Sequence, residues 1–154
     1  MDNIPLAKQV ADELKAYITA SVNCVKESDY QSAQIYLNQA LSISELLEYH
    51  AGAAVALHNL ANLYAVTGKS VAALETATLA LEKAQLSQGD VSAYQTLVHK
   101  LFLLVQKEGI DCVKNKEYSQ ALVCFEAGRP HMPEEKKQSA ERQIALLKGL
   151  LNDR

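Results

Sequence analysis

Gly68, Lys69 and Ser70 are the residues of this chain that come nearest to a phosphate-binding motif. A phosphate-binding loop needs a second glycine five residues earlier and a preceding strand, so that backbone N–H groups can surround the phosphate. Leu63 occupies that earlier position and belongs to a helical pattern. We therefore interpret the triplet as a turn between two helices.

The histidines and cysteines form no catalytic or metal-binding arrangement. No two of the four histidines stand four residues apart around a glutamate, as a helical zinc site requires. We interpret the three cysteines as small apolar packing residues, with a thiol-based enzyme as the alternative. The Gly-x-Ser-x-Gly motif of serine hydrolases is absent, and the acidic residues show no pairing. We predict no catalytic residue, no metal site, no cofactor and no enzymatic activity.

Asn59 and Asn62 are the polar residues whose spacing suggests binding. They lie three residues apart, which places both amides on one face of a helix, and His58 flanks them. An asparagine amide offers a donor and an acceptor, so the pair could hold the backbone of an extended peptide without reading its sequence. The alternative is that each amide bonds a neighbouring helix end or water.

Composition and charge exclude several classes of partner. The net charge is −3 and no Lys/Arg-rich run exists, so we predict no nucleic-acid binding. The longest apolar run, residues 51–57, is far below the ~20 residues that span a bilayer, so we predict no membrane segment. The first five residues lack the features of a secretory signal, and an odd number of cysteines favours a reducing compartment. We predict a cytoplasmic protein.

A repeated pattern of small residues indicates how the chain is organised. A polar or glycine-containing turn precedes Ala33, Ala73 and Ala121 in the same way each time. Another small residue stands twelve positions before each of these alanines: Ser21, Ala61 and Gly109. Such repetition is typical of stacked helical hairpins. Because helix formers are abundant and only 6 Gly and 3 Pro interrupt them, we predict an all-α helical-hairpin repeat solenoid.

We predict about seven helices, forming three hairpins and a C-terminal capping helix. They span about residues 5–27, 30–49, 52–67, 71–87, 91–114, 118–127 and 133–151. Pro5 suits the first position of the first helix, and Asp29 and Asp90 suit the N-caps of the second and fifth. Gly68 suits the left-handed end of the third. The last helix has one apolar stripe and a polar back, as the cap of a helical stack needs.

The pattern resembles the tetratricopeptide repeat, a two-helix hairpin of 34 residues. On this resemblance the repeats span about residues 14–47, 54–87 and 102–135 of a single domain covering residues 1–154. The second repeat matches best, through Leu60, Ala61, Tyr64, Gly68, Ala73 and Ala80. The 40-residue separation of Ala33 and Ala73 is similar to the longer-helix class found in kinesin light chains. The signature tryptophan is replaced in the three repeats by Tyr17, Leu57 and Val105.

The resemblance implies a concave groove lined by the first helix of each hairpin. The positions carried over are Lys15, Ile18, Thr19, Val22, Val25, Lys26, Val55, His58, Asn59, Asn62, Ala65, Val66, Leu103, Gln106, Lys107, Ile110, Val113 and Lys114. Four of them are lysines and none is acidic, which favours an acidic partner or a free C-terminal carboxylate. The alternative is that the lysines are merely solvated at the rim.

The candidate groove residues for peptide binding are therefore Lys15, Thr19, His58, Asn59, Asn62, Gln106, Lys107 and Lys114. We predict an adaptor or scaffold that binds a protein or peptide segment in this groove. The apolar run from Leu101 to Val105 supports an alternative, a self-associating module such as a homodimer. A small secretion-type chaperone of similar repeat number is a further alternative.

Overall fold

The computed structural model describes residues 6–153, and within them the fold is all-α. The helices are α1 Leu6–Lys26, α2 Tyr30–Leu46, α3 His50–Val66, α4 Ser70–Leu86, α5 Ser92–Lys114, α6 Tyr118–Gly128 and α7 Glu134–Asn152, with a short 3₁₀ turn η1 at Arg129–His131. The predicted helix count and hairpin order are confirmed, although α3 begins two residues earlier than predicted. Pro5, predicted to begin the first helix, lies outside the described residues. None of the described helices is long and apolar enough to cross a membrane.

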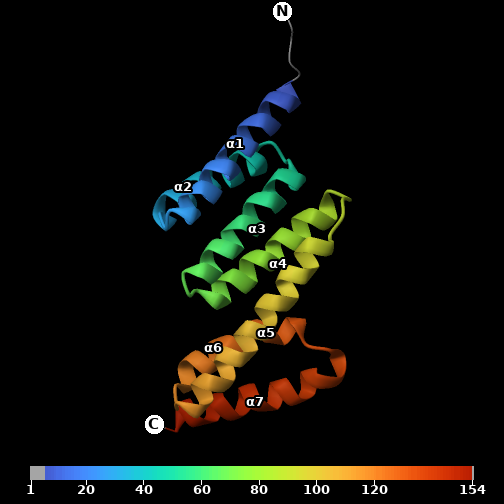
Figure 1. The fold of residues 1–154 in the computed structure, drawn as a ribbon. Helices are drawn as coiled ribbons and strands as arrows, with labels where there is room; N and C mark the ends of the chain where they lie inside the picture. The colour runs from blue at the N-terminus through green and yellow to red at the C-terminus, as the bar shows by residue number, and fades with distance from the viewer. Residues whose placement is uncertain (1–5, 154) are drawn as a thin grey trace, which may run out of the picture. The chain divides into compact units, whose positions relative to one another are not determined.

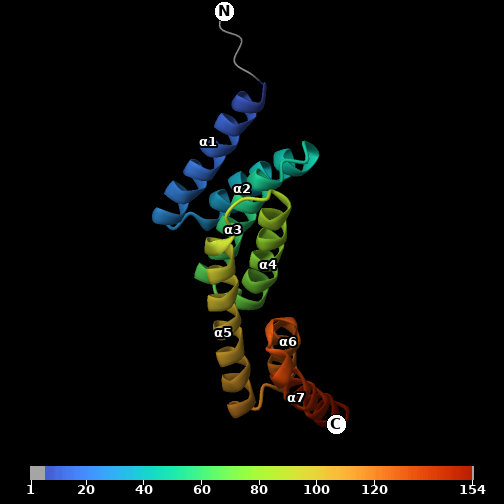
Figure 2. The ribbon, with the colours of Figure 1, turned by 90° about the vertical axis from the view of Figure 1, so that its right-hand side faces the viewer.

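The chain forms two compact units, Met1–Gln95 and Thr96–Arg154, and the boundary between them falls within α5. In the first unit α1 pairs with α2 and α3 pairs with α4 (Figure 1). The contact between α2 and α3 joins these two hairpins. In the second unit α7 packs against α6, which both views show (Figure 2).

The repeated small residues are buried at matched points, as the sequence predicts. Ala33, Ala73 and Ala121 each have 0 % of their surface exposed. In the second unit a Cβ added to Gly109 of α5 would lie 2.9 Å from Cε1 of Phe125 in α6. A separation that short shows that the helices approach closely because no side chain stands between them.

Leucines and aromatic rings fill the remaining space in each core. In the first unit Leu37, Leu57 and Leu60 are buried together, with Tyr64 and Tyr94 packed against them. In the second unit Phe125 is buried with Ile144 and Leu147 of α7. The apolar stripe predicted for the last helix therefore covers α6.

Every turn between the first six helices contains one residue in the left-handed conformation. Gly68 has φ of 82°, as the sequence predicts, but Ser28, Glu48, Gln88 and Lys116 also have positive φ. In four of these turns an N–H bonds a carbonyl five residues earlier, for example Asp29 to Cys24 at 2.8 Å. This hydrogen bond is typical of a helix ended by a left-handed residue, and it compensates for the unfavourable conformation of the non-glycine residues.

Asp29 and Asp90 stabilise the helix starts predicted for them. The backbone N–H of Ser32 donates to Oδ1 of Asp29 at 3.2 Å, and that of Ser92 donates to Oδ1 of Asp90 at 2.9 Å. Hydrogen bonds from these serines lower the pKa of both carboxyl groups, because they stabilise the charged form.

Candidate binding groove

The first unit has a pocket between α1 and α3 that contains both predicted asparagines. This asparagine pocket has a volume of about 160 Å³ and is lined by Ser21, Val22, Val25, Lys26, Leu37, Asn59, Asn62, Leu63 and Val66. Six of these nine residues are positions that the tetratricopeptide resemblance assigned to the concave face. Leu37 of α2 is buried and forms the floor of the asparagine pocket. The structure thus brings Asn59 and Asn62 together with an apolar surface and one lysine.

The side-chain amides of Asn59 and Asn62 differ in their hydrogen bonding. Nδ2 of Asn59 donates to the carbonyl oxygen of Val55 in its own helix at 2.9 Å, a bond that differs from both sequence-based interpretations of this residue. Its Oδ1 and second amide hydrogen remain for other partners. Asn62 is exposed, and its side chain has no hydrogen-bond partner among residues 6–153. Asn62 is therefore the residue of the pair that can offer a full donor and acceptor to a ligand.

A second pocket lies further along the same pair of helices. This tyrosine pocket has a volume of about 240 Å³ and is lined by Ala11, Leu14, Lys15, Ile18, Ala40, Tyr49, Ala51, Gly52 and Val55. Its lining is almost entirely apolar, with Lys15 as the charged member. We call the strip of surface that holds both pockets the α1–α3 seam.

Two predicted groove residues of the first unit lie outside these pockets. Thr19 is exposed on α1 and lines neither of them. The ring of His58 packs edge-on against Tyr94, with centroids 5.3 Å apart, and its Nδ1 is buried without a hydrogen-bond partner. Burial lowers the pKa of His58, because the charged imidazolium loses solvation. His58 is thus a packing residue here rather than a neighbour that presents its ring beside Asn59.

The lowered pKa of His58 predicts a pH-dependent stability. Because protonation is easier in the unfolded chain, the stabilising contribution is complete above the ordinary histidine pKa and is lost as pH falls through the lower folded value. We expect the free energy of unfolding, measured with urea, to decrease from about pH 8 to about pH 5.5. His131 has a pKa lowered by burial too, so H58Q should reduce this dependence without abolishing it. An identical pH profile for H58Q and the parent protein would contradict the assignment.

Three predicted groove residues belong to the second unit. Lys107 and Lys114 are exposed on α5. Gln106 does not present its amide to solvent, because its Nε2 contacts Sδ of Met132 at 3.4 Å and its Oε1 is buried without a partner. The helical position of Gln106 was therefore an insufficient guide to where its amide points. A single groove that includes all eight candidates stays a prediction.

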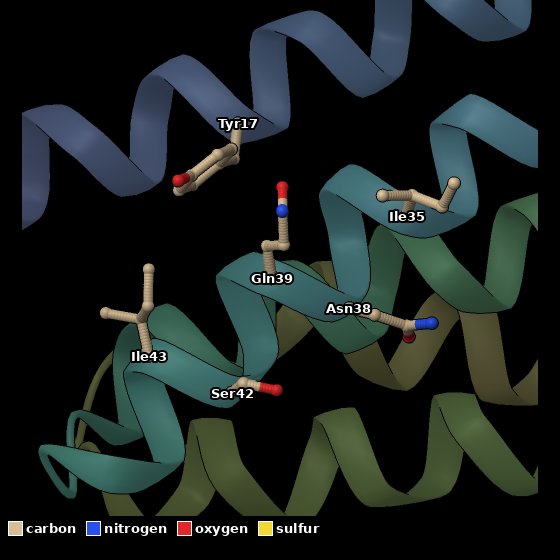
Figure 3. Close-up of a pocket in the computed structure, with 6 residues that line it drawn as sticks. All are labelled: Tyr17, Ile35, Asn38, Gln39, Ser42 and Ile43. Atoms are coloured by element: carbon tan, nitrogen blue, oxygen red, sulfur yellow. The ribbon is translucent and has the colours of Figure 1, made fainter.

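A larger pocket of the first unit lies between α1 and α2 and was not predicted. This outer pocket, of about 430 Å³, is lined by Tyr17, Ile35, Asn38, Gln39, Ser42 and Ile43. Figure 3 shows Tyr17 extending from α1 toward α2, and Gln39 extending from α2 toward α1. The lining carries no charged residue, so it lacks the cationic groups that distinguish the α1–α3 seam.

The cysteines provide no support for thiol chemistry. Burial raises the pKa of Cys24, Cys112 and Cys124, and nearby carboxylates raise all three further. A raised pKa lowers the fraction of thiolate, which is the nucleophilic form. Within residues 6–153 no cluster of three or more His, Cys, Asp or Glu side chains could hold a metal ion.

Tyr49 and Gly52 line the tyrosine pocket but were absent from the sequence-based positions. A Cβ on Gly52 would lie 2.7 Å from both Oγ of Ser44 and Cδ1 of Tyr49, so this glycine permits close packing at the start of α3. A glycine inside a helical pattern was the available signal, since it often marks a close approach.

These features define an all-α helical-hairpin protein with an apolar, lysine-bearing seam on its first unit. The chain is similar to the regulatory protein RapG of Bacillus subtilis (strain 168), with 31% identity over 132 residues. The match covers 86% of this chain and 34% of RapG, so the chain spans about a third of that relative's length. No protein-family model matches the chain, and no solved structure does.

Proposed function

We propose that this chain is a protein–protein interaction module that holds an extended segment of a partner in the α1–α3 seam, without chemical turnover. The observation that carries the proposal is the asparagine pocket, where Asn59, Asn62 and Lys26 stand beside three valines. The valines supply apolar contact, the amides supply donors and acceptors for a peptide backbone, and the lysine attracts an anionic group.

The similarity to RapG supports a regulatory role for such binding. RapG is named a regulatory protein, and a helical-hairpin module can regulate a partner by occupying one of its segments. We propose further that the hairpins are tetratricopeptide-like repeats and that the module acts in the cytoplasm. The matched burial of Ala33, Ala73 and Ala121 supports the repeat assignment.

The asparagines provide the direct test of this function. A binding peptide is first selected from a displayed random library, and its affinity for the parent protein and for N59A/N62A is measured by calorimetry. Losing two hydrogen bonds of ~1 kcal/mol each should weaken binding by roughly tenfold or more. The melting temperature should not fall, since Asn62 is exposed and alanine favours a helix.

N38A/Q39A is the matched control, because it removes two exposed amides from the outer pocket. It should bind the selected peptide as the parent protein does. If N38A/Q39A loses binding while N59A/N62A binds the peptide fully, the peptide binds in the outer pocket. That result would contradict the proposal.

Self-association remains a second candidate, carried by one apolar face of α5. Leu103, Ile110 and Val113 recur at helical spacing on that face and are all exposed. Sedimentation over a wide range of protein concentration separates the two candidates, since a strict monomer excludes self-association.

A further inference from the structure

We infer that the α1–α3 seam recognises an extended acidic segment carrying two apolar side chains four residues apart. This inference rests on the proposed function and specifies the ligand of the same site. It depends on the two pockets of the seam, their separation, and the charges beside them.

Each pocket has the size of a site for one side chain. Their volumes, about 240 and about 160 Å³, lie below the range of roughly 300–1,000 Å³ typical of pockets for whole small molecules. Alanines, Leu14, Ile18 and Val55 make up most of the tyrosine pocket, and valines and leucines make up five of the nine residues of the asparagine pocket, so each favours an apolar side chain. The tyrosine pocket, which is the larger, takes the bulkier of the two.

The separation of the pockets follows from the helix residues that line them. On α1 the tyrosine pocket uses residues 11–18 and the asparagine pocket residues 21–26. On α3, counted from its N-cap Tyr49, the corresponding residues are 49–55 and 59–66. With a rise of 1.5 Å per residue, the pocket centres lie about 13–16 Å apart along the seam. An extended chain advances about 3.3 Å per residue, so four residues cover about 13 Å.

The spacing between the two apolar side chains of the ligand must be an even number of residues as well as long enough to join the two pockets. Successive side chains of an extended segment point to opposite sides, so residues four apart both face the seam, whereas residues three or five apart do not. A helical ligand would gain little from Asn62, because the backbone N–H and C=O groups of the ligand are already paired within its own helix. The asparagine amides thus favour an extended ligand.

The charges of the seam favour an acidic ligand. Lys15 lines the tyrosine pocket and Lys26 the asparagine pocket, and no residue that lines either pocket is acidic. Neither lysine forms an ion pair within residues 6–153. In a chain of net charge −3, two unpaired lysines beside adjacent apolar pockets complement a segment with acidic residues around its apolar ones.

The test uses designed peptides, blocked at both ends, in which one Phe and one Leu stand two, three or four positions apart in a Ser/Glu background. Their affinities for the intact chain are measured by calorimetry. We expect the four-apart peptide to bind at least tenfold more tightly than the other two. Replacing its glutamates with lysines should weaken binding about tenfold, by loss of charge complementarity.

Two exposed residues of the seam supply matched variants. Val66 and Lys26 both line the asparagine pocket, and both are exposed, so their replacement should leave the fold intact. V66F should fill the pocket and reduce the difference between the four-apart and two-apart peptides. K26E should reduce the preference for the acidic peptide. A parent protein that binds all three spacings equally would overturn the inference.

Failure of the spacing rule and failure of the proposed function have different signatures. Suppose that a library-selected peptide binds and that N59A/N62A weakens this binding, but that none of the designed peptides binds. The inferred ligand class is then wrong, and the proposed function stands. If neither the designed peptides nor the library give a ligand, both are wrong.

Discussion

Replacing Phe125 with alanine should lower the free energy of unfolding by about 3–5 kcal/mol, the largest effect we expect from one side chain of the second unit. The ring of Phe125 is buried with Ile144 and Leu147 of α7, and it lies over Gly109 of α5. Its removal leaves a cavity where α6 meets both helices, and the packed backbone closes such a cavity only in part. Urea unfolding followed by circular dichroism measures the loss.

A double-mutant cycle shows whether this effect arises at the α5–α6 contact. G109A alone should destabilise by ~1–3 kcal/mol, because its Cβ would lie 2.9 Å from the Phe125 ring. In the F125A background the same change should cost much less, since the ring atoms that the added Cβ would meet are gone. V123A is the control, as Val123 is 46% exposed on the same helix. Additive effects of G109A and F125A would contradict the assigned contact.

The core of this fold was predictable from sequence because close helix contacts demand small side chains. Ala33, Ala73 and Ala121 could be identified by their recurrence, and all three have no exposed surface. The turns were less predictable. A left-handed residue is required at each, but Glu48 and Lys116 adopt that conformation without being glycine, so only Gly68 gave a signal.

The candidate site shows where sequence reasoning loses detail. Helical spacing places Asn59 and Asn62 on one face of α3, and the asparagine pocket holds both of them together with Val22 and Lys26 of α1. Position does not determine side-chain conformation, so the bond from Asn59 to Val55 and the burial of the Gln106 amide were not foreseen. The bond from Asn59 follows from the tendency of asparagine to bond a nearby backbone carbonyl, whereas the Gln106 amide is held by its contact with Met132.

Replacing Leu37 with alanine should destabilise the first unit by about 2–5 kcal/mol and should weaken peptide binding as well. Leu37 is 1% exposed and belongs to the buried cluster that includes Ala33 and Leu60. It also forms the floor of the asparagine pocket. One side chain therefore supports both the packing of α2 against its neighbours and the apolar surface that a ligand would touch.

Ile35 provides the comparison, because it lies two residues away on α2 and is 53% exposed. I35A should cost less than about 1 kcal/mol and leave binding in the seam unchanged. Urea unfolding and calorimetry with the library-selected peptide measure the two properties on the same samples. N59A/N62A should lose affinity alone, whereas L37A should lose affinity and stability together, since the pocket floor is part of the core. If L37A loses stability but binds the peptide as well as the parent protein, the ligand does not contact the asparagine pocket, and the proposed site on the α1–α3 seam is wrong.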